Sequence, residues 1–169
     1  MATQKSPNAQ PETAQPESLD ALCHREVVEL HQFFEDWFLA KLDDTDAAFD
    51  RFSSAMADSF QIVPPSGFMS DIDRLNVRLR SAHGAWTGPD GNGTGWIWVS
   101  AVNTRPVAGH DDLCLVTYEE WQEREGVARG RQSTALMQRD ESAPGGVLWL
   151  HVHETWLPPD RPAEARPGS

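Results

Sequence analysis

Residues 96–157 read WIWVSAVNTRPVAGHDDLCLVTYEEWQEREGVARGRQSTALMQRDESAPGGVLWLHVHETWL. Four segments of this stretch are rich in Trp, Val, Leu, Thr and Tyr, with side chains that alternate in character, and a period of two is typical of β-strands. Runs of turn residues separate the segments, and short connections make neighbouring strands antiparallel. The segments lie at about 96–107, 112–124, 128–140 and 146–157. The sequence therefore predicts an antiparallel meander.

The residues before the meander follow a helical period. Apolar side chains between Leu19 and Leu42 recur at steps of three, four and seven, as on one face of a long helix, and Ser18 stands in the N-cap position. Two shorter helices are predicted at about 45–56 and 71–83, the second capped by Ser70, with a short strand at 60–63 between them. Helices followed by a meander give an α+β fold, in which the helices pack in a strongly curved antiparallel sheet.

Length and composition fit one domain with a tail at each end. A chain of 169 residues suits a single domain. Residues 1–17 and 158–169 are rich in Pro and polar residues and have too few large apolar side chains to offset the entropy of ordering, so both are predicted to be disordered. The folded domain is predicted to span residues 18–157.

Charge and cysteine usage narrow the class of protein. The net charge of −12 argues against nucleic acid and against a membrane surface as partners, since both attract proteins through clustered Lys and Arg. No apolar stretch approaches the roughly 20 residues of a membrane-spanning helix. Cys23 and Cys114 have no paired spacing and no secretion signal is recognisable, which predicts reduced thiols in a soluble cytoplasmic protein.

Several short motifs carry a family resemblance. The segment 130–136, followed by a turn and Trp149–His153, resembles the end of the NTF2-like superfamily, in particular its SnoaL-like and DUF4440 branches and the association domain of calmodulin-dependent kinase II. Residues 60–67, a strand that runs into a Pro-Gly turn before a helix, resemble the early strand of the same family. The resemblance implies a cone-shaped α+β fold that encloses one pocket, and a homodimer or larger homo-oligomer.

The resemblance implies little about activity. The superfamily includes isomerases, dehydratases, epoxide hydrolases, cyclases, transport factors and assembly domains, and fold does not give function. The chain matches neither the Tyr and Asp pattern of the steroid isomerases nor the Asp-Arg-Asp arrangement of the limonene-type epoxide hydrolases. Ala135 stands where the kinase branch has a pocket arginine.

His151 and His153 are the first candidate catalytic residues. Residues two apart on a strand share a face, so the two imidazoles point the same way. Together they could bind an anion, move a proton or hold a metal. Alternatively, one lines the pocket mouth and the other lies at the rim or at a dimer contact. A metal would need a third ligand, such as Glu119 or His83, and no spacing supports one, so neither a metal nor another cofactor is predicted.

Tyr118 and Glu119 complete the candidate catalytic set. On the predicted strand 112–124, Tyr118 and Glu120 share one face and Glu119 lies on the other, so one of the two glutamates faces inward. An inward carboxyl group in an apolar pocket would have a raised pKa, which suits a general acid or base. The alternative is that both glutamates lie near the solvent-exposed end of the strand.

The candidate ligand-binding residues combine aromatic rings with two basic side chains. Arg131 could hold an anionic group in a bidentate grip or form a surface ion pair. His83 faces the sheet, where a bond to a backbone carbonyl is favoured, whereas His24 and His31 are expected to be solvated. The tryptophans are expected to fill the core, a dimer interface or a ligand cage. The set is His83, Trp86, Arg131, Trp98, Trp121 and Trp149.

Two functions follow as hypotheses. The first is a small-molecule pocket protein of the SnoaL-like type, which binds an apolar or aromatic ligand, with isomerisation, dehydration or hydrolysis by acid–base chemistry left open. The second is a non-catalytic homo-oligomerisation or ligand-sensing module. An inward Glu or His in a closed apolar pocket would favour the first, and a flat Trp-rich face with a shallow pocket the second.

Overall fold

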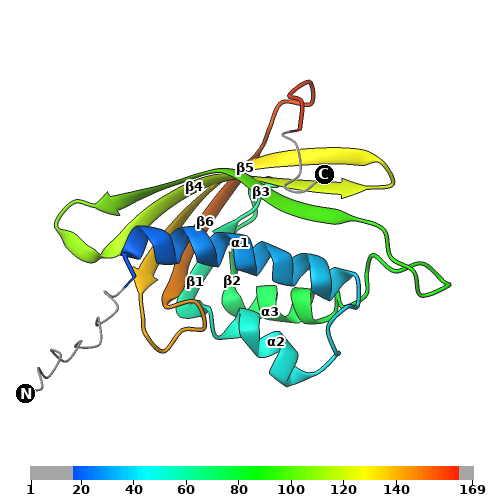
Figure 1. Ribbon diagram of the computed structural model, residues 1–169, viewed down its shortest axis with the longest axis horizontal. Helices are drawn as coiled ribbons and strands as arrows, with labels where there is room; N and C mark the ends of the chain where they lie inside the picture. The colour runs from blue at the N-terminus through cyan, green and yellow to red at the C-terminus, as the bar shows by residue number, and fades with distance from the viewer. Residues whose placement is uncertain (1–16, 164–169) are drawn as a thin grey trace, which may run out of the picture.

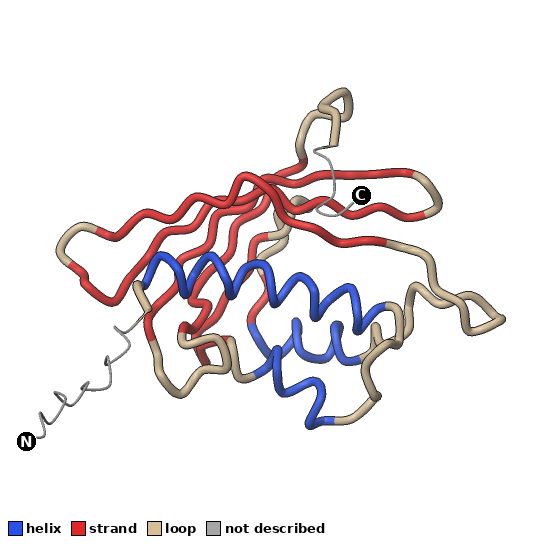
Figure 2. Tube along the Cα trace, in the orientation of Figure 1, coloured by secondary structure: helices blue, strands red, loops and turns tan. Residues whose placement is uncertain are grey.

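The computed structural model describes residues 17–163, in which three helices pack against one face of a six-stranded sheet (Figures 1 and 2). The elements are α1 (Leu19–Phe38), α2 (Asp46–Ser53), β1 (Met56–Val63), β2 (Ser70–Asp71), α3 (Ile72–Arg80), β3 (Trp96–Val107), β4 (His110–Arg124), β5 (Val127–Arg139) and β6 (Val147–Trp156). No helix among these is long and apolar enough to cross a membrane. The predicted α+β cone, with helices packed in a strongly curved sheet, is confirmed.

The sheet has the strand order β2-β1-β6-β5-β4-β3. The strands β3 to β6 form the predicted antiparallel meander. The pairing of β1 with β6 is parallel, with Met56 opposite Trp149, so the expectation of an antiparallel sheet is corrected for this pair. The reason is topological, because the chain passes through α3 and three long strands before β6 returns beside β1 in the same direction.

The helix ends follow local sequence signals. The side chain of Ser18 accepts from the Ala21 amide at 3.2 Å, as predicted for an N-cap. α1 ends at Phe38 rather than at the predicted Leu42. Two residues after Phe38, Ala40 adopts a φ of 52°, which a helix does not permit. The cap of α3 is Asp71, one residue after the predicted Ser70.

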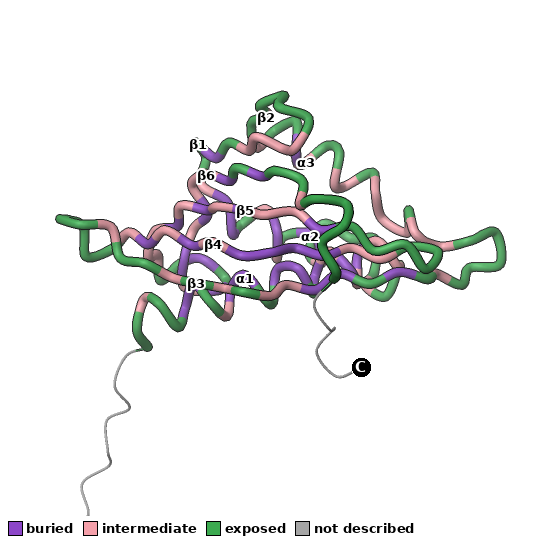
Figure 3. The backbone as a smooth tube through the Cα atoms, turned by 90° about the horizontal axis from the view of Figure 1, so that it is seen from above, coloured by how far each residue is buried: buried purple, intermediate pink, exposed green. Residues whose placement is uncertain are grey.

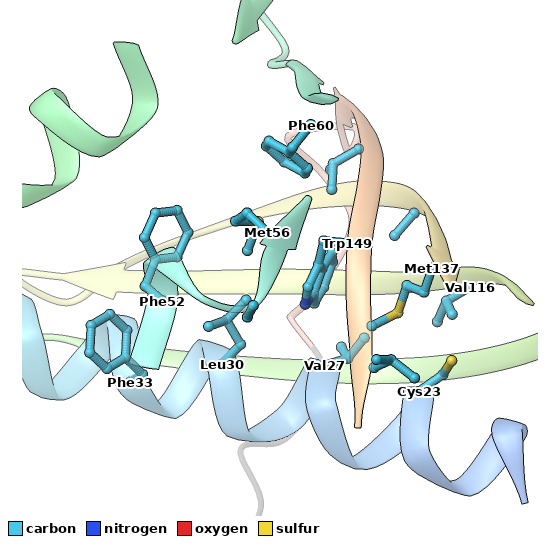
Figure 4. Close-up of a cluster of buried hydrophobic side chains, with 14 of the residues drawn as sticks. Cys23, Val27, Leu30, Phe33, Phe52, Met56, Phe60, Val116, Met137 and Trp149 are labelled. Atoms are coloured by element: carbon cyan, nitrogen blue, oxygen red, sulfur yellow. The ribbon is translucent and has the colours of Figure 1, made fainter. Parts of the chain in front are cut away.

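The hydrophobic core lies between α1 and the inner face of the sheet, and Figure 4 shows Leu30 and Val27 of α1 beside Trp149 of β6. Figure 3 shows the buried residues along the middle of the strands and the exposed ones at the hairpin tips and loops. Side chains alternate between the two faces of a strand. On β4, Val116 and Tyr118 face the helices, and Glu119 faces outward.

A buried glutamate joins three elements at one end of this core. Glu26 of α1 is fully buried and accepts from both Nη atoms of Arg51 on α2, at 3.1 and 2.8 Å. It also accepts from Nε1 of Trp149 on β6 at 3.2 Å. The Glu26 carboxylate lies so close to Gly145 that the site has no room for a Cβ. This ion pair therefore ties α1, α2 and β6 together.

The segment after β6 lies against the outer face of the sheet. The amide of Leu157 donates to the carbonyl of Gly130 at 3.0 Å, and Arg161 forms an ion pair with Glu119. Arg161 belongs to the stretch predicted as a C-terminal tail. The N-terminal tail prediction falls on residues 1–16, outside the described part of the chain, and on Glu17. The domain boundaries at 18 and 157 stay predictions.

Candidate functional site

A pocket of about 430 Å³ lies between the helices and the inner face of the sheet. Its walls are mainly apolar, and four phenylalanines from α1, α2 and β1 contribute to them: Phe34, Phe38, Phe52 and Phe60. Arg78 and Ala85 also line it and are exposed, so the pocket meets solvent near α3. Small-molecule sites in proteins have this size and this mostly apolar character.

Three charged side chains from neighbouring strands form the polar wall of the pocket. Arg131 of β5 donates from Nη2 to Oε1 of Glu120 on β4 at 2.6 Å, and from Nη1 to Oε2 of Glu154 on β6 at 2.9 Å. Both glutamates are buried, at 4% and 6% exposure. Strand alternation explains the cluster, because Arg131 lies directly opposite Glu120 on β4, and Glu154 on β6, two residues along from the position opposite Arg131, faces inward as well.

His31 of α1 closes this cluster from the helical side. Its Nδ1 lies 2.7 Å from the carbonyl oxygen of Val27 and its Nε2 lies 3.2 Å from Oε2 of Glu120. A carbonyl oxygen only accepts, so Nδ1 carries a proton and donates it. Nε2 faces a carboxylate oxygen, to which it donates a hydrogen bond when the ring carries both protons. His31 is buried, so the expectation of a solvated side chain is wrong.

The two carboxyl groups of the cluster differ in their partners. Glu120 accepts from Arg131, from His31 and, at 2.7 Å, from Nε2 of Gln122. Burial alone would raise the pKa of Glu120, but Arg131 and His31 outweigh it and hold this pKa below its ordinary range. Glu154 has one hydrogen bond in the described part of the chain, from Arg131. Burial, and then the charge of Glu120, raises the pKa of Glu154 although Arg131 opposes the shift.

Four of the predicted site residues line the pocket: Tyr118, Trp86, Arg131 and Trp149. Tyr118 is 2% exposed, and burial raises the pKa of its hydroxyl, followed by the charges of Glu120 and Glu154. The Tyr118 ring lies edge-on to His31 at 5.1 Å, so it borders the charged cluster.

The other predicted residues lie elsewhere. His151, His153, Glu119, Trp98 and Trp121 lie on the outer face of the sheet and do not line the interior pocket. His83 lies outside the pocket too, where its Nε2 is 2.8 Å from the Leu42 carbonyl oxygen, the structural bond that the sequence favoured. A register shift on β6 explains the histidines, because Trp149 faces inward but His151, two residues later, faces outward.

Glu154 was not among the residues predicted for the site, Glu119 was named in place of Glu120, and His31 was expected to be solvated. A signal for each was present. His31 stands four residues after Val27 and three before Phe34, on the apolar stripe of α1. Glu154 and His153 are neighbours on a strand and point to opposite faces of the sheet. Knowing which face one of them occupies therefore determines the face of the other. Among residues 17–163, no group of three or more His, Cys, Asp and Glu is placed to hold a metal ion.

A curved sheet that holds three helices around one pocket defines an α+β domain of the NTF2-like class, and solved structures confirm this fold. An NTF-2 like protein of unknown function from Pseudomonas aeruginosa matches with a TM-score of 0.68 at 24% identity, covering 81% of this chain and 99% of that one. The CamKII hub homology domain of Chlamydamonas reinhardtii matches with a TM-score of 0.56 at 15% identity, covering 80% and 99%.

A match to a family model places the chain more specifically than the fold does. Residues 23–158 match the family model described as Sucrose-6-phosphate phosphohydrolase C-terminal, and the chain belongs to this family. Sucrose-phosphatase 1 of Nicotiana tabacum is 29% identical over 136 residues, and Probable sucrose-phosphatase 3a of Arabidopsis thaliana is 24% identical over 133. Each match covers 78% of this chain, which spans only 30% and 29% of the two relatives.

Proposed function

We propose that this domain binds a small molecule with an apolar, aromatic body in the pocket between its helices and its sheet. The observation that carries the proposal is the pocket itself, which combines aromatic walls with one charged wall. A concave, mostly apolar pocket with a few polar groups is the usual form of a small-molecule site, which supports binding as the use of this pocket.

Acid–base chemistry on the bound molecule is the second part of the proposal. Two carboxyl groups whose surroundings move their pKa values in opposite directions are the usual arrangement for an acid and a base. Glu120 is held ionised by three donors, and Glu154 is the group that exchanges a proton. Tyr118, at the border of the cluster, is placed to orient the ligand.

Filling the pocket tests binding directly. Ala82 lines the pocket, and Ala82→Phe adds a ring inside it. We expect 2-naphthol to quench the fluorescence of the wild-type protein, because Trp86 and Trp149 line the same pocket, and the variant to bind it at least tenfold more weakly.

The matched control is Ala128→Phe, the same change at an exposed site on β5. It should leave the affinity for 2-naphthol unchanged. Equal weakening by both variants, or undiminished binding by Ala82→Phe in a protein that melts normally, would refute the interior site.

A second candidate function, homo-oligomerisation, is favoured by the outer face of the sheet. Half-buried Leu115 and Leu136 lie there beside His151 and His153, around a hollow of about 470 Å³. The CamKII hub homology domain, which has a similar fold, is named as a hub, and this name supports homo-oligomerisation here. We propose a homodimer whose interface covers this hollow. In a monomer the apolar side chains that line the hollow would be exposed to solvent.

Charge on that face should break the homodimer. Leu136→Glu places a carboxylate in the wall of the hollow, and we expect sedimentation at micromolar concentration to change from dimer to monomer. Val127→Glu, at an exposed site on the tip of the β4–β5 hairpin, is the control and should stay dimeric. A wild-type protein that sediments as a monomer of about the chain mass, 18.8 kDa, would defeat this candidate.

A further inference from the structure

The pocket offers one carboxyl oxygen without a donor. All the hydrogen bonds that Glu154 makes within residues 17–163 go through Oε2, to Arg131. Glu120, in contrast, has contacts on both oxygens, with Arg131 and Gln122 donating to Oε1 and Nε2 of His31 facing Oε2. Oε1 of Glu154 is not among the fully buried polar atoms that lack a partner, so this oxygen is accessible and open to a hydrogen bond from a bound donor. Since Glu154 lines the pocket, its Oε1 is the natural acceptor for a ligand.

The charges around Glu154 indicate a neutral ligand. Arg131 of β5 faces it directly, Glu120 of β4 and His31 of α1 lie in the same cluster, and Tyr118 borders it. Arg131, the permanent cation of the cluster, is already shared between two carboxylates, and His31 lies against Glu120. The remaining pocket cation, Arg78, is exposed on α3. A ligand anion would therefore lie among carboxylates and lose its hydration without compensation.

From these contacts we infer that the pocket selects a neutral alcohol or phenol, whose hydroxyl donates to Oε1 of Glu154 while its apolar body lies among the aromatic walls. This inference rests on the proposed binding function and adds the class of ligand. The acceptor is a charged group, and hydrogen bonds to charged groups are stronger than those between neutral groups.

The preference for a hydroxyl donor should weaken as the pH falls. Burial and the charge of Glu120 raise the pKa of Glu154, so lowering the pH protonates Glu154 before an ordinary glutamate. A protonated carboxyl group donates as well as accepts. At low pH the pocket should therefore accept a ligand that has only an acceptor, such as an ether, about as well as one with a hydroxyl.

Three probes with one ring system test the inference: 2-naphthol, which donates, 2-methoxynaphthalene, which only accepts, and 2-naphthoate, an anion. At pH 7.5 we expect 2-naphthol to bind about tenfold tighter than 2-methoxynaphthalene, as one hydrogen bond to a charged group provides, and 2-naphthoate to bind weakest. The preference for 2-naphthol should shrink at pH 5. In Glu154→Gln it should be small at both pH values, because the amide does not titrate.

Glu119→Gln is the matched control, since Glu119 is as buried as Glu154 but lies on the outer face. It should keep the wild-type preference and its pH dependence. Equal affinities for the three probes at both pH values would overturn the ligand class and leave the binding function standing. Absence of binding by all three would overturn the binding function, and the ligand class with it. Should Glu154→Gln fail to fold, the wild-type pH series decides the question alone.

Discussion

Replacing Arg131 with methionine is expected to lower the free energy of unfolding by about 3–5 kcal/mol at neutral pH, since removal of one partner leaves buried charges uncompensated. Arg131 is the direct partner of both Glu120 and Glu154, and both glutamates are buried. Arg129→Met, at an exposed site two residues earlier on β5, is the matched control and should change stability by less than about 0.5 kcal/mol. Urea unfolding of the two variants measures the difference.

The loss caused by Arg131→Met should depend on pH. In the wild-type protein the pKa of Glu120 is lowered, so its stabilising contribution is present above the unfolded value of about 4.3 and is lost as the pH falls below it. The pKa of Glu154 is raised, so its ionisation costs stability as the pH rises through the folded value. Without Arg131 both carboxyl groups would hold their protons to higher pH.

Acid should therefore reduce the difference between Arg131→Met and the wild type. Unfolding at pH 7.5 and at pH 5 compares the two conditions, and we expect the smaller difference at pH 5, where protonation removes the uncompensated charges. The same loss of stability at both pH values would show that Arg131 acts through packing alone. The charged wall of the pocket would then be a passive part of the scaffold.

Gly145→Ala is the second change with a large expected effect. An added Cβ would overlap Oε2 of Glu26 and lie 2.7 Å from its Cδ. Glu26 cannot move away freely, because it is fully buried and bonded by Arg51 and Trp149. We expect a loss of about 3–5 kcal/mol, since the methyl group must either strain the core or break a buried ion pair.

Gly88→Ala provides the control for Gly145→Ala. There an added Cβ would lie 3.0 Å from Oδ1 of Asp90, an exposed side chain that can turn away. Thermal melting should show a shift of only a degree or two for Gly88→Ala, because exposed substitutions of this kind change stability little. Similar melting temperatures for both variants would mean that Glu26 does not hold α1, α2 and β6 together.

The sequence was enough to predict the architecture, because its signals are local. Period-two segments with turn residues between them predicted β3 to β6 to within a few residues of the observed ends. The parallel pairing of β1 with β6 was missed, because residues 56 and 149 meet only through the path of the whole chain. No local pattern in a strand of eight residues shows which distant strand will lie beside it.

The candidate site was predicted only in part, for a physical reason. Alternation assigns residues to two faces without saying which face is inner, and one irregular step reverses the assignment. On β6 that step separates Trp149, which lines the pocket, from His151, which does not. The outer Glu119 was placed in the catalytic set although Glu120, one residue later, faces the pocket. Arg131 and Tyr118 were placed in the pocket by sequence and structure alike.

The position of 2-naphthol in a structure of its complex with the protein is the most direct test of interior binding. We predict that the ring system lies against Phe34, Phe52 and Phe60, inside the pocket of about 430 Å³, with its hydroxyl within hydrogen-bond distance of Oε1 of Glu154. A ring system on the outer face beside His151 and His153, with the interior pocket free of ligand, would contradict the proposed function.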